Sequence, residues 1–393
     1  MSNLLSVYIH IPFCRTRCGY CDFNTYAGYD NLKDAYVNAV VKEISLVSKE
    51  IGNNELVHTV FFGGGTPNLL LPRQLEKIIS SIKENFRCKS EIEISIEANP
   101  TCLTGEYLKS LLDLGINRLS LGMQSASERD LKNLGRKHTF LDVSKSVENA
   151  RNAGFSNINL DLIFGIPQQT LKSFEDSLNA ALGLSPDHLS LYALSVEDLT
   201  PMAIQIANGN LPEPDDDLAA DMYILAMELL EGRGFSQYEI SNWARSEEVQ
   251  CLHNLQYWRN LDYLGFGAGA HSHFMHSRSE NLKAIADYIG SFAKNQSAEF
   301  ISPAATKYIS LSDKDEMSET MMMGMRLTGE GISSVDFAER FGAQLEVIYS
   351  EEIAKLQKRE LVEWIIKNGQ QRLRLTQKGR LLGNQVFLEF IRD

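Results

Sequence analysis

The segment VYIHIPFCRTRCGYCDF, residues 7–23, places three cysteines in a loop directly after a short apolar strand pattern. Cys14, Cys18 and Cys21 are separated by four and three residues. One loop of this kind can bind three irons of a four-iron cubane, which leaves the fourth iron open to chelate an amino acid through its amine and carboxylate. A structural zinc site formed by the three cysteines and His10 is the alternative on these residues alone.

The loop begins a repeated unit over about the first 200 residues: a short β-rich run, a loop and an amphipathic helix. Strands that alternate with helices of this length predict a parallel sheet with right-handed crossovers. Six units are two short of a complete barrel, so we expect an α/β protein with an open, partial (β/α)6 TIM-like barrel and a smaller mixed C-terminal domain. The predicted strands are residues 7–11, 57–62, 91–97, 118–122, 158–163 and 188–194, and the predicted helices are residues 34–49, 72–85, 105–114, 142–153 and 171–182.

A second region begins where the composition changes after residue 194, and residues 211–217 (LPEPDDD) have the character of a linker. From about residue 241 the pattern becomes mixed, which predicts a barrel domain over residues 1–240 and a C-terminal domain over residues 241–393. The tail, residues 361–391, has the helix, β-ribbon and helix order of a winged helix. Because the chain is acidic and lacks a basic stripe, we expect a structural or docking role for this tail.

The charge and the cysteine content exclude several classes of protein. The 393 residues carry a net charge of -13, which disfavours nucleic acid as a partner because phosphate binding needs a cationic surface. No apolar run reaches membrane-spanning length, and residues 1–6 lack the basic stretch of a signal peptide. Six unevenly placed cysteines do not form a disulfide framework in a chain of this length, so we expect a reducing cytoplasm.

Polar residues gather at the carboxyl ends of the predicted strands, where ligands of parallel α/β folds bind. Consecutive glycines at residues 63–65 allow close approach of the backbone to a ligand. In residues 91–97 (EIEISIE) the isoleucines share one face and the polar residues share the other, with Glu97 at the carboxyl end. Gln124, Arg136 and Asp161 stand near the ends of later strands. Together they predict a binding site that borders the cysteine loop.

The cysteine loop, preceded by Tyr8-Ile-His-Ile-Pro-Phe13, resembles the radical S-adenosylmethionine superfamily and, more narrowly, its oxygen-independent coproporphyrinogen III dehydrogenase branch. Further matching segments are residues 63–67 (GGGTP), 96–100 (IEANP), 122–125 (GMQS), 135–138 (GRKH), 161–170 (DLIFGIPQQT) and 265–272 (GFGAGAHS). The resemblance implies a [4Fe–4S] cluster on the three cysteines, with S-adenosylmethionine on the open iron. It also implies contacts to S-adenosylmethionine from Tyr8, Tyr20, Gly64, Gly65, Thr66, Glu97, Gln124, Arg136 and Asp161.

Two features separate the chain from the dehydrogenase. That enzyme resembles Cys-x3-Cys-x2-Cys-x-Cys, whereas the last position here is Phe23, and only thirteen residues precede the cysteine loop where the dehydrogenase carries an N-terminal extension. Residues 253–258 (HNLQYW) instead match the His-Asn-x-x-Tyr-Trp signature of HemW-type heme chaperones, which implies heme ligation by His253. Cys251 and His271 are further candidate ligands, and a core histidine is the alternative role for His253.

The resemblance therefore predicts a heme chaperone that carries a [4Fe–4S] cluster and S-adenosylmethionine, binds heme and delivers it to respiratory-chain hemoproteins. The alternative is a coproporphyrinogen III dehydrogenase, which would decarboxylate porphyrinogen propionates oxidatively; for the chaperone we expect no catalytic residue. The expected partners are heme and heme-accepting membrane proteins, without nucleic acid. We expect a cytoplasmic chain, and leave open a homodimer and peripheral contact with the inner face of the cytoplasmic membrane.

Overall fold

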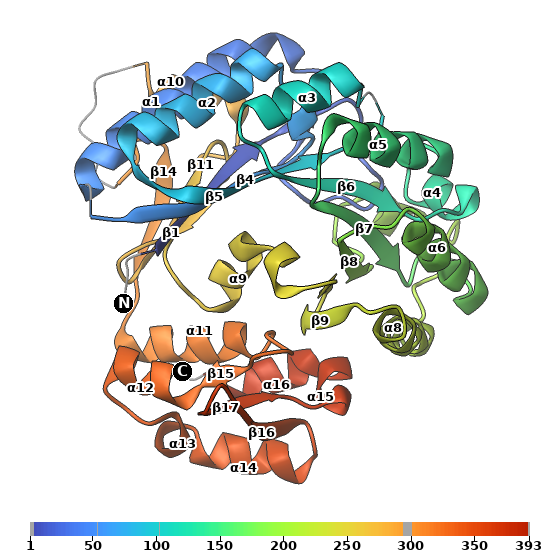
Figure 1. The fold of residues 1–393 in the computed structure, drawn as a ribbon, viewed down its shortest axis with the longest axis vertical. Coiled ribbons are helices and arrows are strands. Elements are labelled where there is room, and N and C mark those ends of the chain that lie inside the picture. Colours follow the sequence, from blue (N-terminus) through green and yellow to red (C-terminus); the bar gives the residue numbers. More distant parts are fainter. Residues whose placement is uncertain (1–3, 53, 102, 294–300, 392–393) are drawn as a thin grey trace.

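The first half of the chain forms one sheet in which the predicted strands are parallel neighbours (Figure 1). The computed structural model describes residues 4–52, 54–101, 103–293 and 301–391. Within these ranges the two edge strands of the sheet do not pair with each other, so the predicted open (β/α)6 barrel is confirmed. The six parallel strands lie side by side in chain order: β1 (Leu4–Ile11), β4 (Leu56–Gly64), β5 (Arg87–Ala98), β6 (Arg118–Gln124), β7 (Ile158–Phe164) and β8 (His188–Ala193).

Helices cover the outer face of this sheet, where the crossover connections place them (Figure 1). Several begin at a threonine whose hydroxyl accepts a hydrogen bond from a backbone N–H of the first turn, namely Thr104, Thr139 and Thr170. These caps fix where each connection turns back toward the sheet. The covering helices are α1 (Lys33–Ile51), α2 (Pro72–Asn85), α3 (Gly105–Asp113), α5 (Phe140–Ala153) and α6 (Leu171–Gly183).

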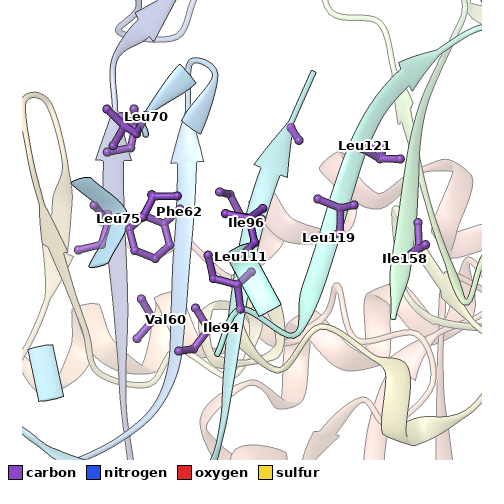
Figure 2. Packing of buried hydrophobic residues seen from close by; sticks show 14 of the residues in the cluster. Val60, Phe62, Leu70, Leu75, Ile94, Ile96, Leu111, Leu119, Leu121 and Ile158 are labelled. Carbon is purple, nitrogen blue, oxygen red and sulfur yellow. The ribbon is translucent and has the colours of Figure 1, made fainter. Parts of the chain in front are cut away.

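The main core lies between the strands and these helices (Figure 2). On β5, Ile94 and Ile96 are buried against the helical layer, while Glu93 and Glu97 lie on the opposite side of the strand. Apolar residues of neighbouring strands and helices, labelled in Figure 2, continue the same layer. The alternation of β5 therefore sends its carboxylates into the interior of the open barrel, as the sequence predicts.

Short strands from later in the chain extend both edges of the sheet. β11 (Tyr263–Phe266) lies parallel to β1, and β12 (His271–His273), β13 (Ser277–Asn281) and β14 (Ala305–Ser310) follow it in antiparallel order. On the other edge, β10 (Asn242–Ala244) and β9 (Ser236–Glu239) pair after β8. These short edges were not among the predicted strands.

The C-terminal region has a core of its own, which runs from Met321 to Phe390 among the described residues. Because β10 to β14 belong to the main sheet, we propose that the second unit begins near the start of α11 rather than at residue 241. Its tail has the helix, ribbon and helix order predicted for a winged helix. The elements are α11 (Asp313–Gly324), β15 (Ile332–Ser333), α12 (Ser334–Phe341), α13 (Leu345–Ile348), α14 (Ser350–Lys358), β16 (Val362–Lys367), β17 (Gln370–Leu375), α15 (Gln377–Leu381) and α16 (Gly383–Glu389).

A short helix, α9 (Leu252–Trp258), lies between the open side of the sheet and the C-terminal unit (Figure 1). It contacts β4 on one side and α11 on the other. No helix in the described ranges is long and apolar enough to cross a membrane. The remaining elements are β2 (Phe13–Cys14), β3 (Tyr26–Ala27), α4 (Glu128–Asn133), α7 (Pro201–Ala207), α8 (Asp216–Glu231), α10 (Ile285–Ser291) and short 3-10 helices at Asp30–Leu32, Pro67–Leu69 and Glu247–Val249.

Candidate functional site

The cysteine loop lies at the carboxyl end of the sheet and is held there by the glycine turn after β4. Gly65 N donates to Ile11 O at 2.8 Å, and Thr66 N donates to Phe13 O at 2.8 Å. The Thr66 hydroxyl lies 3.6 Å from the sulfur of Cys14. Burial raises the pKa of the Cys14 and Cys21 thiols, so thiolates here need a nearby positive charge such as a metal.

Only glycine fits at two positions of this turn, because neighbouring atoms leave no room for a Cβ. Gly64 has φ +107°, and a Cβ there would lie 2.5 Å from the ring of His10. A Cβ on Gly65 would lie 2.7 Å from Phe13 O and 3.0 Å from the sulfur of Cys14. No side chain fits at either position, so the backbone itself approaches the cysteines closely.

Two carboxylates lie behind the glycines. Glu97 accepts a hydrogen bond of 3.2 Å from the N–H of Gly64, and burial with the neighbouring Asp161 raises the pKa of Glu97 to about 7. Asp161 accepts hydrogen bonds from Ser120 at 3.1 Å and from Asn159 at 2.7 Å, while burial raises its pKa. Both groups would be stabilised in their charged form by a cationic ligand or by hydroxyl donors.

Gln124 and Arg136 have unused hydrogen-bonding capacity in the described part of the chain. The Arg136 guanidinium donates to the Cys18 sulfur at 3.3 Å and to Gly122 O at 2.8 Å, but its Nε has no partner. The Oε1 atom of Gln124 is also unpartnered, and its backbone is left-handed with φ 64°. Strain and unmade bonds at buried positions are typical of sites that await a ligand.

These groups surround one cavity of about 660 Å³ that opens to the surface. Its size falls within the roughly 300–1,000 Å³ of small-molecule sites. It brings together most of the predicted site residues, namely Cys14, Cys18, Tyr20, Cys21, Gly64, Gly65, Thr66, Glu97, Gln124, Arg136 and Asp161. Three thiols at one end, with carboxylates and a guanidinium along the walls, suit an iron–sulfur cluster and an amino-acid-bearing nucleoside.

The geometry does not support the zinc alternative. His10, the proposed fourth ligand, uses Nε2 for Asn24 O at 2.9 Å and Nδ1 for the Tyr8 hydroxyl at 3.0 Å. Within the described ranges, no three His, Cys, Asp or Glu side chains converge as a single metal ion requires. A cubane differs because each thiolate binds a separate iron, so its ligands need not meet at one point.

Two predicted residues, Tyr8 and His253, lie outside this cavity. They line a smaller inner cavity of about 180 Å³, which adjoins the first through shared walls at Glu97, Ser120, Asp161 and Tyr192. His253 is 1% exposed, and burial lowers its pKa to about 3. A neutral, enclosed imidazole fits the core-histidine alternative.

Both ring nitrogens of His253 already have partners: Nδ1 bonds Thr59 Oγ1 and Nε2 bonds the Tyr257 hydroxyl, each at 2.8 Å. The Glu93 carboxylate accepts from the backbone N–H groups of Leu252 and His253 at 3.0 and 3.2 Å, which anchors the start of α9. Ligation of an iron by His253 therefore requires one of these side-chain bonds to break.

The other candidate heme ligands differ in accessibility. Cys251 is buried, and burial raises the pKa of its thiol to about 12, which opposes the thiolate form. The His271 side chain on β12 is 61% exposed and lies near Glu280, so it is a surface group rather than a core residue. Neither residue lines either of the two cavities described above.

Several cavity residues were not predicted. Ser120, Asn159 and Ser190 form a polar layer around Asp161, and Asn159 bonds His188 at 2.6 Å. The signal for Ser120 was present, because Arg118, Ser120, Gly122 and Gln124 alternate along β6 as the glutamates do along β5. The neighbours of Asp161 on β8 depend on the register between the two strands, which cannot be read from the sequence.

A three-cysteine loop on an open parallel barrel defines a radical S-adenosylmethionine protein, and residues 8–181 match the Radical SAM superfamily model. Residues 311–382 match the HemN C-terminal domain. The structure of coproporphyrinogen III oxidase HemN from Escherichia coli superposes with TM-score 0.82 and 25% identity, over 98% of this chain and 89% of that one. Membership of the superfamily implies a [4Fe–4S] cluster and S-adenosylmethionine, for which the cavity residues are suited.

Relatives that match this chain along its full length show which family within the superfamily it belongs to. The heme chaperone HemW of Bacillus subtilis is 39% identical over 98% of this chain and 99% of its own length. HemW of Lactococcus lactis is 35% identical over 99% of this chain and 97% of its own length. The chain belongs to the HemW family.

Proposed function

We propose that this protein is a heme chaperone, which binds heme and passes it to respiratory-chain hemoproteins while carrying a [4Fe–4S] cluster and S-adenosylmethionine. The observation that carries the proposal is the 39% identity to Bacillus subtilis HemW along the full length of both chains. The intact cofactor cavity supports it. A cytoplasmic location, peripheral contact with membrane-bound acceptors and a homodimer belong to the same proposal.

The cluster would bind to the thiolates of Cys14, Cys18 and Cys21, and it would supply an open iron and one-electron redox chemistry. Arg136, which already donates to the Cys18 sulfur, would offset the negative charge of the thiolates and neutralise a ligand carboxylate. Close approach of the backbone at Gly64 and Gly65 would accommodate the methionine part of S-adenosylmethionine.

The carboxylates would bind the polar parts of the same ligand. Asp161, set in its layer of hydroxyl and amide donors, would accept from ribose hydroxyls, and Glu97 would attract positive charge. Gln124 and Thr66 offer further polar atoms, and Tyr20 offers an aromatic wall. Tyr8 would contribute indirectly by positioning the glycine turn, because its hydroxyl bonds the His10 ring that lies under Gly64.

His253 is proposed as the axial heme ligand, on condition that Tyr257 turns away from Nε2. Reconstituted protein should bind hemin with a Soret shift, and His253→Ala should change the position of the Soret band. An identical spectrum in this variant would remove the histidine from the ligand set. His271→Ala is the matched comparison, because that side chain is exposed and lines neither cavity.

Metal content tests the cluster assignment. Anaerobically purified protein should contain close to four irons and four sulfides per chain. Cys18→Ala should lose both, whereas Cys88→Ala should keep them, because Cys88 is half-buried and lies outside the cavity. Zinc without acid-labile sulfide in the unmodified protein would overturn the assignment.

Coproporphyrinogen III dehydrogenation is the second candidate, favoured by the similarity to HemN over 98% of this chain. Phe23 at the fourth position of the motif argues against it. An anaerobic assay with coproporphyrinogen III, a reductant and S-adenosylmethionine separates the two functions. Protoporphyrinogen IX formed over many turnovers would replace the chaperone proposal.

A further inference from the structure

We propose that heme docks at the mouth of the cofactor cavity, with its carboxylates on Arg15 and Lys137 and its apolar ring against Phe23. The inference rests on the proposed heme function and gives that function a location. It differs from ligation at His253, because the mouth is open to the surface while His253 is enclosed. The two sites can therefore be tested separately.

The apolar part of this surface consists of large side chains that project at the rim. Phe23 lines the cavity and is 64% exposed, and Tyr192, on the wall that the two cavities share, is 42% exposed. The Phe23 ring is thus an exposed apolar surface that adjoins the cavity lining, where a flat ligand can pack against it.

The charged part comes from two loops that are joined to each other. Arg15 is in the cysteine loop, Lys137 follows Arg136, and Gly19 N donates to Leu134 O at 3.1 Å between these loops. Arg15 and Lys137 are exposed and make no ion pair within the described ranges. In a chain of net charge -13, two unpaired cations at one opening suit an anionic ligand.

Apart from these two cations and the groups of the cofactor site, the charged groups of the lining are Arg17, which is bonded within the cysteine loop, and two carboxylates. Arg17 donates to the carbonyls of Cys21 and Phe23 at 3.2 and 3.4 Å, which holds the loop that carries Phe23. Asp22 and Glu197 also line the cavity, and Glu197 accepts a 2.7 Å hydrogen bond from Ser195. The opening has an apolar part at Phe23 and a cationic part at Arg15 and Lys137. A flat ligand with an apolar face and carboxylates at one edge fits these two parts better than a uniformly charged ligand does. Heme has that form.

The size of the two cavities favours the mouth over the inner site. The inner cavity of about 180 Å³ is below the roughly 300–1,000 Å³ of small-molecule sites, and the outer cavity of about 660 Å³ would be taken up by the cluster and S-adenosylmethionine, so heme would lie over the opening rather than inside it. Docking at the mouth requires no movement of α9.

Hemin titration of anaerobically reconstituted full-length protein tests this site. The double variant Arg15→Glu/Lys137→Glu should raise the hemin Kd at least about tenfold, which corresponds to about 1.4 kcal/mol, and Phe23→Ser should raise it several-fold. Lys49→Glu/Lys358→Glu changes the net charge equally at exposed positions elsewhere and should stay within about twofold. Iron and sulfide contents confirm that each variant retains the cluster.

Hemin dimethyl ester, which lacks the free carboxylates, gives a test that needs no variant of the cysteine loop. It should bind the unmodified protein more weakly than hemin does, and Lys137→Glu should not weaken its binding further. If Lys137→Glu and the double variant bind hemin like the unmodified protein while His253→Ala abolishes binding, docking at the mouth is wrong and the chaperone proposal stands. If the unmodified protein binds no hemin, the proposed function itself fails.

Discussion

The outer and inner cavities share walls, and each has a buried polar atom without a partner in the described ranges. They differ in how the residues that could bind an iron are placed: the three cysteines face the open cavity, whereas Arg118 Nε is the unpaired atom beside His253. Around the cysteine loop, Gln124 Oε1 and Arg136 Nε are buried without partners, and Gln124 has a strained backbone. Around His253, both ring nitrogens are bonded and Glu93 anchors the adjoining helix. Unmade bonds cost stability, and a protein retains them where a ligand will complete them. The outer cavity therefore presents unpaired groups beside the cysteine loop, while in the inner one His253 is already bonded and must lose a bond before it can bind a ligand.

The largest effect on the outer cavity is expected from a substitution at Gly65, in the turn that holds the cysteine loop. Gly65→Ala should abolish cluster and S-adenosylmethionine binding, because its Cβ would lie 2.7 Å from Phe13 O and 3.0 Å from the Cys14 sulfur. Iron and sulfide analysis measures the loss. Gly183→Ala is the control, since nothing lies within 4 Å of a Cβ there. Full cluster occupancy in the Gly65 variant would mean that the glycine turn does not constrain the cysteines.

The inner cavity should respond in stability rather than in cofactor binding. His253→Ala leaves Thr59 and Tyr257 without their partner, so the free energy of unfolding should fall by about 2–4 kcal/mol. Urea unfolding of the cofactor-free protein measures it, with His271→Ala expected within about 0.5 kcal/mol of the unmodified chain. A His253 variant of unchanged stability would contradict the assigned role of these bonds.

The pH dependence should also separate the two cavities. The pKa of Glu97 is raised from 4.5 to about 7, so its carboxyl is protonated more readily in the folded than in the unfolded chain. Ionisation then costs stability as pH rises from about 4.5 to 7, while a cationic ligand favours the charged form.

S-adenosylmethionine should therefore bind about five- to tenfold more tightly at pH 8 than at pH 6, and Glu97→Gln should remove this dependence. Equilibrium binding across this range is the measurement. His253, with its pKa lowered to about 3, should contribute nothing between pH 5 and 9. An equal pH dependence in Glu97→Gln would assign the titration to another group.

The smallest expected effect concerns strain at Gln124. Gln124→Gly relieves the left-handed backbone at φ 64° and should stabilise the cofactor-free protein by about 0.5–1 kcal/mol. The same change removes a polar atom from the cavity and should weaken S-adenosylmethionine binding. Thermal unfolding and binding measured on one preparation reveal the trade-off. Loss of both stability and affinity would show that the side chain supports the fold instead.

Local patterns were enough to predict the strands, the open barrel and the residues at its carboxyl end. The alternation of residues 91–97 placed Glu97 on the inner face, and the spacing of the cysteines indicated a cluster loop. The pattern could not predict β11 beside β1, because that strand is short and comes from more than 200 residues further along the chain. The proposed later start of the second unit rests on the same short strands, which the sequence pattern did not reveal.

What the sequence by itself determined is therefore the periodic part of the molecule: strand, helix and turn positions, and a set of chemically suited residues at one edge. Only the tertiary structure decided which polar groups are already paired. His253 and Thr59 are separated by 194 positions, and their bond depends on the placement of α9 under β4. Hydrogen-bond pairing across such distances follows from packing, and no local pattern carries it.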